Sequence, residues 1–376
     1  MRTVFSSEHD LFRDNVRRFV ETEIVPYHRQ WEKDGIVPRE LWLKAGEAGL
    51  LLCSIPEEYG GGGGDFGHNA VVIEELARVN ASGPGFSMQS DVAAPYINQY
   101  GTEEQKRRWL PPMARGEMIA ALGMTEPGTG SDVKAIRTSA VQRDGNYVIN
   151  GQKTFITNGE NADIVILAVK TNPKLGHRGV SLICVEKGTA GFSKGQSLDK
   201  IGLLAQDTAE LFFENATVPL ANLLGAEDEG FGYLMHNLPQ ERLVLALRAA
   251  ASMEGMLENT VAYTRQRQVF GKSLFELQNT RFKLASAKAQ TTMFRAFVDE
   301  CLAALINGQL SPALAAMAKL LGTEMQGTVL DELLQLHGGY GFMNDYPIGR
   351  AWRDARVMRI YGGSSEIMRE IISREL

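Results

Sequence analysis

The sequence predicts an α+β protein that is mostly helical, with a small β-domain between two helical regions. Apolar residues recur every three or four positions over roughly the first 115 residues, and again from Gly230 to the C-terminus. Between them, from Ala121 to Val218, short β-branched and aromatic runs alternate with turn residues. This order favours helices that hold a β-domain against them. We expect domains at 1–120, 121–225 and 226–376.

Local signals in the first region support helices. Ser6 or Ser7 is a candidate N-cap for a helix that Pro26 is expected to end or bend. Thr102-x-x-Gln105 is a candidate capping box. The five glycines from Gly60 to Gly64 predict a surface loop, because no Gly-Lys-Ser/Thr follows that would favour a phosphate site.

The central region reads as an antiparallel barrel or sandwich. Asp144-Gly145-Asn146 predicts a hairpin turn, and no helical period separates the strands, which makes a parallel βαβ sheet improbable. No GxGxxG follows a first strand, so a nicotinamide-binding fold is not supported. The expected strands are 147–149, 154–157, 164–169, 180–185 and 211–213.

Composition excludes several functions. A net charge of −6 argues against broad nucleic-acid binding. No run approaches the ~18 apolar residues of a membrane span, and the first ten residues match neither a signal nor a transit peptide. The three scattered cysteines suit a reducing compartment, and we expect a cytoplasmic protein. The histidines form no HExxH or similar pair, so no metal site is expected.

One stretch, from Leu238 to Ala246, sets a carboxylate beside an arginine on a strongly apolar helix. Pro239 suits a first helical turn, or a kink in a longer helix, and we expect Glu241 near a helix start. There the helix dipole favours a solvated capping glutamate. The alternative is a general base in an apolar cleft. These residues alone leave both interpretations open.

Several glycine-rich or polar motifs are each ambiguous alone. Small residues in Met124–Asp132 let main-chain N–H groups approach a flat or anionic ligand, although a plain turn is equally compatible. The basic cluster at 265–271 suits a pyrophosphate or a solvated helix end. Phe155–Gly159, Gln335–Gly341 and Ile360–Glu366 read as turns after regular elements.

Together, in this order, the motifs MTEPGTGSD, FITNG, RQVFG, QLHGGYG and IYGGSSEI resemble the acyl-CoA dehydrogenase family over essentially the whole chain. The resemblance is closest to the long-chain members. It implies an N-terminal helical domain, a central β-barrel domain, a C-terminal four-helix bundle, bound FAD and a homotetramer. It also implies the transfer of electrons to electron-transferring flavoprotein.

The resemblance assigns cofactor roles by matching motif positions. The isoalloxazine ring and its edge are expected at Leu122, Met124, Thr125, Gly130, Ser131, Phe155, Ile156 and Thr157. The pyrophosphate and adenosine, shared across a subunit interface, are expected at Arg267, Phe270, Gln278, Gln335, Leu336, His337, Gly338 and Gly339. Ser364, Ser365 and Glu366 are expected to complete the flavin site. Many relatives carry tryptophan where Phe155 stands.

The implied reaction removes the α-hydrogen of an acyl-CoA as a proton and passes the β-hydrogen as hydride to flavin N5, giving a trans-2-enoyl-CoA. Medium- and short-chain members carry the base where this chain has Gly362. Gly362 keeps only a backbone N–H, which suits an oxyanion donor. Long-chain and isovaleryl-type members place the base on the helix that carries Glu241, so this residue is the expected base and Glu366 its nearest competitor. The expected substrate residues are Pro84, Gly85, Ser131, Tyr233, Arg242, Gly362 and Gly363.

The substrate prediction is a straight long-chain acyl-CoA, with branched chains also accepted. It rests on similarity to the long-chain members at 200–202, 206–213 and 238–242, and on small residues at 83–85 that deepen the acyl cavity in that relative. Three alternatives stay open: a short- or branched-chain (isovaleryl-type) dehydrogenase, a flavin monooxygenase or oxidase on the same fold, and a non-catalytic binding module. An acyl-carrier-protein thioester is an open alternative to CoA.

Overall fold

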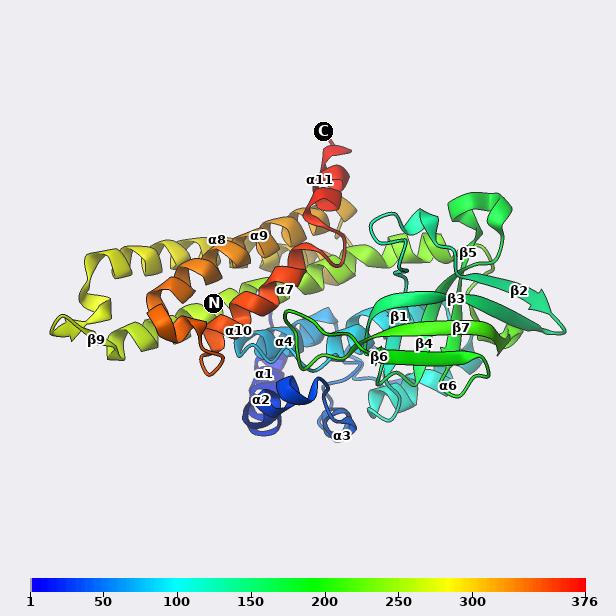
Figure 1. The fold of residues 1–376 in the computed structure, drawn as a ribbon, viewed down its shortest axis with the longest axis horizontal. Coiled ribbons are helices and arrows are strands. Elements are labelled where there is room, and N and C mark those ends of the chain that lie inside the picture. The colour runs from blue at the N-terminus through cyan, green and yellow to red at the C-terminus, as the bar shows by residue number, and fades with distance from the viewer. Residues whose placement is uncertain (1) are drawn as a thin grey trace.

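The computed structural model describes residues 2–376 and confirms the order of helical, β and helical regions (Figure 1). The N-terminal helices are α1 (Ser7–Phe19), α2 (Val25–Asp34), α3 (Arg39–Glu47), α4 (Phe66–Arg78), α5 (Ala94–Tyr100) and α6 (Glu103–Ala114). Both capping predictions are confirmed: the Ser6 hydroxyl accepts from the N–H of His9, and Thr102 and Gln105 form a complete capping box. Pro26 does not end the helix, because it lies in the first turn of α2, directly after a π-helical turn at Val20–Ile24.

The β-domain is one mixed, open sheet rather than the expected antiparallel barrel. Its strand order is β6-β7-β3-β2-β4-β5-β8, with β1 paired to β4. Among the described strands, the two ends of this order do not pair, so no barrel closes. The strands are β1 (Ala120–Gly123), β2 (Ser139–Arg143), β3 (Asn146–Thr157), β4 (Ile164–Lys170), β5 (Val180–Glu186), β6 (Phe192–Ser197), β7 (Thr208–Pro219) and β8 (Leu223–Leu224).

The parallel pairs explain why the sequence argument failed. β1 and β2 both pair with β4 in parallel. Parallel neighbours need a long crossover, usually a helix. Here the chain leaves β1 at Gly123 and reaches β4 at Ile164 through a loop and the β2–β3 hairpin, so a crossover exists without any helical period. The hairpin itself is confirmed, with Asp144 and Gly145 both at positive φ.

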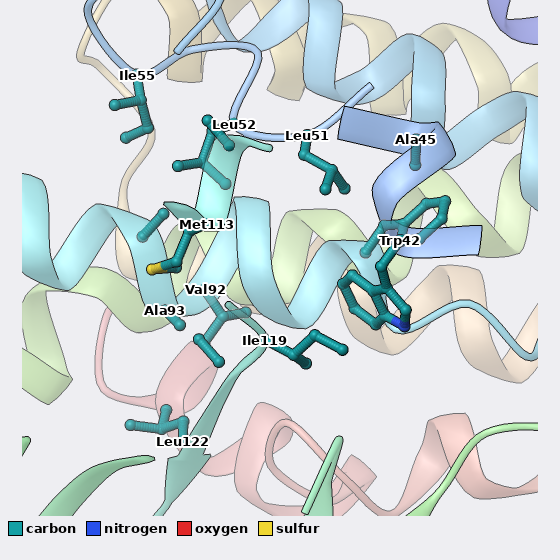
Figure 2. Close-up of a cluster of buried hydrophobic side chains, with 14 of the residues drawn as sticks. Trp42, Ala45, Leu51, Leu52, Ile55, Val92, Ala93, Met113, Ile119 and Leu122 are labelled. Carbon is teal, nitrogen blue, oxygen red and sulfur yellow. The ribbon is translucent and has the colours of Figure 1, made fainter. Parts of the chain in front are cut away.

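The hydrophobic core joins the sheet to the N-terminal helices. Figure 2 shows Trp42 and Leu52 of the helical region in one buried cluster with Ile119 and Leu122 of the β-domain entry. Alternate residues of β4 belong to different clusters: Ile164, Ile166 and Ala168 join this one, whereas Val165, Leu167 and Val169 pack on the other face of the sheet. Because β4 is buried on both faces, it reads as a continuous apolar run.

The C-terminal region is built around α7 (Gly230–Gln266), which contains 37 residues and is therefore about 55 Å long. It runs from the β-domain to the far end of the molecule (Figure 1). Helices α7, α8 and α9 pack against one another, and the unpredicted α10 packs on α7 and α9. The elements after α7 are β9 (Gln268–Val269), β10 (Lys272–Ser273), α8 (Gln278–Ile306), α9 (Pro312–His337), α10 (Pro347–Ala355) and α11 (Ser365–Ser373).

The length of α7 corrects the expected position of Glu241. Pro239 lies inside the helix, which begins at Gly230, so Glu241 is near the third turn rather than the first. Gly230 permits this early start, because a Cβ there would lie 2.8 Å from the Ser181 backbone of β5. The capping interpretation of Glu241 is therefore wrong, since no free N-terminal N–H groups lie beside it. No helix among residues 2–376 is long and apolar enough to cross a membrane.

The crossing of α4 and α7 gives a stability prediction. A Cβ at Gly255 of α7 would lie 1.9 Å from the carbonyl oxygen of Arg78, whereas a Cβ at Gly232 of the same helix would meet only one atom, at 3.8 Å. Gly255→Ala is expected to destabilise the protein by about 1–3 kcal/mol through overpacking. Gly232→Ala should be neutral or stabilise by up to ~1 kcal/mol through helix propensity. Thermal unfolding of both variants checks this, and equal melting temperatures would contradict the tight crossing.

Candidate active site

Glu241 is a deeply placed carboxylate that a ligand can still reach. It lies far from bulk solvent, yet its side chain keeps partial accessible surface. The hydroxyl of Tyr96, from α5, donates a hydrogen bond of 2.9 Å to its Oε1. Burial raises the pKa of Glu241 to about 7, and the Tyr96 hydrogen bond and the charge of Arg242 oppose that rise. A carboxyl group with this pKa is suited to accept a proton near neutral pH.

Tyr96 packs in a cluster of three tyrosines, Tyr96, Tyr100 and Tyr233, of which the sequence predicted a functional role only for Tyr233. Its side chain is fully buried, and its ring lies beside that of Tyr100. Tyr100 stacks on the predicted substrate residue Tyr233, with ring centroids 3.9 Å apart. Asn237, one turn before Glu241, donates to the backbone oxygen of Tyr233. Tyr96 itself was missed, because nothing in the sequence connects it to a glutamate 145 residues away.

Arg242 is a buried cation with unmet hydrogen-bonding capacity. Only 6% of its surface is exposed, and its Nε is buried with no partner among the described residues. Burial lowers the pKa of Arg242, although the charge of Glu241 opposes this. A buried donor without a partner is costly. The predicted role of Arg242 as a substrate contact is consistent with that free donor.

The turn at Gly362 and Gly363 lies against α7 one helical turn beyond Glu241. A Cβ at Gly362 would be 2.7 Å from Cδ1 of Leu245, and both glycines have positive φ, so larger residues are disfavoured. The fully buried Lys319 of α9 donates from Nζ to the Gly363 oxygen at 2.6 Å. Burial lowers the pKa of Lys319 to about 8. The structure therefore brings the expected oxyanion donor, Gly362, close to the expected base.

The tail of this motif argues against the competing base. Ser364 caps α11, and the buried Ser365 donates to Glu324 of α9. Glu366 is exposed, and hydrogen bonds from its own backbone N–H and from Ser364 lower the pKa of its carboxyl group. A solvated, more acidic carboxylate is a poorer proton acceptor than Glu241.

On the β-domain side, the Met124–Asp132 loop rests on a buried ion pair. Lys153 Nζ, fully buried in β3, donates to Glu126 at 2.8 Å and to the Met124 oxygen at 3.0 Å. Glu126 also accepts from two backbone N–H groups, at residues 137 and 138. Gly128 and Gly130 face open space, where a Cβ would meet no atom within 4 Å. Thr125 and Met124 are partly exposed, and Ser131 is exposed.

Phe155 supplies an exposed aromatic face beside that loop. Its φ is +58°, it lies at a register break between β3 and β7, and 68% of its surface is exposed. A break of this kind turns a side chain out of the sheet. Thr157 is half-buried, whereas the side chains of Ile156 and Leu122 are buried in the cores and leave only their backbone for a ligand. An exposed ring beside an open glycine loop fits the flat ring of a flavin.

The neighbouring Asn158 ties this strand end to the predicted acyl cavity. Its Nδ2 donates to the oxygens of Gly85 and Ala120, at 3.2 and 3.0 Å. Pro84 and Gly85 therefore lie beside the end of β3 rather than in a separate part of the molecule.

The remaining predicted cofactor residues form a second, distant group. Tyr263 stacks on His337 with centroids 4.1 Å apart, and Arg267 lies over the ring of Tyr340. Phe270 is 95% exposed, and the end of α7 lies roughly 40 Å along the helix from Glu241. Figure 1 shows the end of α7, beside β9, at the opposite end of the molecule from the β-domain. The group consists of Arg267, Phe270, Gln278, Gln335, Leu336, His337, Gly338 and Gly339.

One potential metal-binding group lies among the described residues, away from this site. His9, Asp65 and His68 have ligand atoms within 4.8 Å of one another. Helix capping accounts for most of their contacts, because His9 closes the cap of α1 and Asp65 caps α4.

Comparison with known proteins identifies the family of this chain. Family models described as the N-terminal, middle and C-terminal domains of acyl-CoA dehydrogenase match residues 6–117, 121–216 and 228–376. The long-chain specific acyl-CoA dehydrogenase of Sus scrofa mitochondria is 50% identical over all of this chain and 88% of its own length.

Two solved structures are similar over nearly their full length. An acyl-CoA dehydrogenase from Geobacillus kaustophilus superposes with a TM-score of 0.98 at 47% identity, covering 100% of this chain and 99% of that one. A glutaryl-CoA dehydrogenase from Mycobacterium smegmatis, solved in complex with FADH2, has a TM-score of 0.93 at 28% identity and covers 99% and 95%. Three domain models that together match most of the chain, and a relative 50% identical over all of it, show that the chain belongs to the acyl-CoA dehydrogenase family.

Proposed function

We propose that this protein catalyses the FAD-dependent α,β-dehydrogenation of long-chain acyl-CoA thioesters to trans-2-enoyl-CoA. The observation that carries the proposal is the carboxylate of Glu241, which burial and a single tyrosine hydrogen bond tune to a pKa of about 7. An exposed glutamate would be ionised but too weak a base for a thioester α-proton. A buried one, reachable through a cleft, is a stronger base.

In this proposal the residues of the chain divide the work. Glu241 accepts the α-proton, and the backbone N–H of Gly362 donates to the thioester oxygen, where negative charge develops. Arg242 and Tyr233 contact the substrate, and the glycine pair leaves room for the thioester next to Leu245. FAD, when bound against Met124–Ser131 and Phe155–Thr157, supplies the acceptor for the hydride that leaves the β-carbon. Ser364 to Glu366 complete the walls of that site.

Substrate class follows from similarity rather than from geometry. The relative from Sus scrofa with 50% identity is a long-chain specific enzyme, and Pro84 lines a cavity between α4, α7, α9 and α10. A short-chain or isovaleryl-type specificity is the less supported alternative. The monooxygenase and binding-module alternatives are also less supported, because the buried base is present.

Assembly and partners extend the same proposal. The distant group around Arg267 and His337 would bind the pyrophosphate and adenosine of a neighbouring subunit's FAD, which requires an oligomer and suits a homotetramer. Electron-transferring flavoprotein would dock near the exposed Phe155. Three buried free cysteines are compatible with a cytoplasmic location.

The proposed architecture has domain boundaries near 120 and 225. Its C-terminal domain is a four-helix bundle built on α7, α8 and α9. The pairwise packing of these three helices supports that bundle.

The base assignment predicts a large kinetic defect. Glu241→Gln keeps the shape of the side chain but cannot accept the proton, so the rate of flavin bleaching by palmitoyl-CoA under anaerobic conditions is expected to fall by at least ~10³. Glu366→Gln tests the competing base, and because Glu366 is proposed only to line the flavin site, its rate should fall far less than that of Glu241→Gln. If the flavin of Glu241→Gln bleaches at nearly the wild-type rate and that of Glu366→Gln bleaches slowly, Glu366 rather than Glu241 is the base.

The hydrogen bond from Tyr96 predicts a shift in pH dependence. Because the base acts when ionised, the rate of bleaching should rise with pH through about 7. Tyr96→Phe removes a donor that favours the ionised form, so this limb should move to higher pH by up to ~1 unit. Tyr100→Phe, which removes a hydroxyl that does not contact Glu241, should leave the limb in place. If the pH at which the bleaching rate rises is unchanged or lower in Tyr96→Phe, the claim that Tyr96 lowers the pKa of Glu241 is contradicted.

A further inference from the structure

A partly open cavity lies between α4, α7, α9 and α10. Its empty volume is about 550 Å³, including the space at its mouth. Pro84 lines one side, and Ile73, Leu76 and Ala77 of α4 give it an apolar wall. The other side of the cavity is polar and is formed by Arg248 and Ser252 of α7, Gln326 of α9 and a group around Asp354 of α10.

The register of α7 places this cavity in line with the base. Glu241, Leu245, Arg248 and Ser252 follow one another at intervals of four, three and four residues, so they share one face of the helix. Leu245 contacts the Gly362 turn, where the thioester is proposed to lie. Arg248 is therefore about 10 Å along the helix axis from Glu241. An acyl chain held at the base would meet Arg248 with its distal part.

Three polar side chains of this cavity have no protein partner. Gln326 is 2% exposed, and its Oε1 is buried without a hydrogen bond among the described residues. Within the same residues, neither the half-buried guanidinium of Arg248 nor the buried hydroxyl of Ser252 takes part in a hydrogen bond or ion pair. Buried polar groups are nearly always paired, so the orphaned Gln326 Oε1, together with a guanidinium and a hydroxyl that line the same cavity without a protein partner, points to a ligand.

The other polar residues of the cavity are already satisfied. Asp354 accepts hydrogen bonds from the N–H of Leu203, from Ser82, from Asn80 and from Arg353. Its negative charge is thus balanced within the protein. The free hydrogen-bonding capacity belongs to Arg248, Ser252 and Gln326, which together offer one positive charge, donors on the guanidinium, the hydroxyl and the Gln326 amide nitrogen, and one acceptor, the buried Gln326 Oε1. This arrangement fits an oxygen acceptor, and an anionic one best.

We propose that this cavity binds the distal end of an acyl chain that carries an oxygenated group, with a terminal carboxylate as the best match. Arg248 would pair with the carboxylate, and Ser252 and Gln326 would donate to its oxygens. A chain that ends in a methyl group would leave all three side chains without partners. The inference rests on the proposed function and narrows its substrate class to long-chain thioesters with a polar end.

The test measures binding without turnover. The oxidised holoenzyme is titrated with trans-2-hexadecenoyl-CoA and with its ω-carboxy and ω-hydroxy counterparts. The same three chain ends on trans-2-dodecenoyl-CoA test whether a shorter acyl chain places its end in the cavity. We expect wild type to bind the ω-carboxy form of at least one length about tenfold or more tighter than the methyl-ended form, the effect of a charge-assisted hydrogen bond. The ω-hydroxy form should lie between them.

Two variants assign the preference to the cavity. Arg248→Leu should abolish the preference and improve binding of the methyl-ended chain, and Gln326→Leu should reduce the preference less. Arg18→Leu, which replaces an exposed arginine of α1 far from the cavity, is the matched control and should keep the wild-type ratio. Thermal unfolding confirms that each variant is folded. If Arg248→Leu does not fold, Gln326→Leu alone must lower the ratio.

The outcomes separate this inference from the proposed function. Equal or tighter binding of the methyl-ended chains at both lengths in wild type would overturn it and leave the three side chains to water. An unchanged ratio in both cavity variants would also overturn it. Failure of palmitoyl-CoA to bleach the flavin would instead remove the proposed function itself. If palmitoyl-CoA bleaches the flavin but the ω-carboxy forms do not bind, only the proposal of a polar chain end is contradicted.

Discussion

The proposed activity depends on holding one carboxylate, that of Glu241, away from bulk solvent on a long helix. A group whose pKa is moved from 4.5 to about 7 by burial disfavours its ionised form by on the order of 3 kcal/mol. Since the folded-state pKa is raised, this group costs little stability at acidic pH, and the folded state loses stability as the pH rises through about 7. The packing around α7 offsets that cost. Tyr96 offers the hydrogen bond that keeps the ionised form accessible.

The continuity of α7 connects the other parts of the proposed site. The first turn of α7 contacts β5 at Gly230, Glu241 lies about three turns further on, and Leu245, one turn later, meets the Gly362 turn. The buried Lys319 donates to that turn from α9. If Glu241 is the base, as proposed, the glycine at 362 is left to act through its backbone N–H. The same helix face then continues past Arg248 into the polar end of the cavity.

Local signals in the sequence predicted local structure well. The caps at Ser6 and Thr102 and the hairpin at Asp144 and Gly145 depend on residues a few positions apart, and all are confirmed. Glu241 was selected as the base through family resemblance, because its local context alone also suited a capping residue. The structure removes the capping interpretation, because Glu241 lies inside α7.

Features that join distant parts of the chain were not predictable in this way. The parallel pairing of β1 with β4 bridges 44 positions, from Ala120 to Ile164, without the helix that normally signals such a crossover. No pattern in the sequence predicts the contact of Tyr96 with Glu241. The start of α7 at Gly230 depends on the close approach of β5. The free guanidinium of Arg248 is visible only once its surroundings are known.

Proton removal by Glu241 can be measured separately from hydride transfer. A thioester such as 3-thiapalmitoyl-CoA has sulfur in place of the β-carbon and cannot give up a β-hydride, so only α-proton exchange remains. In D₂O, mass spectrometry should show deuterium entering the α-position with the wild-type holoenzyme. The exchange should slow by at least ~10³ with Glu241→Gln. Exchange at the wild-type rate in Glu241→Gln would contradict the claim that this buried carboxylate is the base.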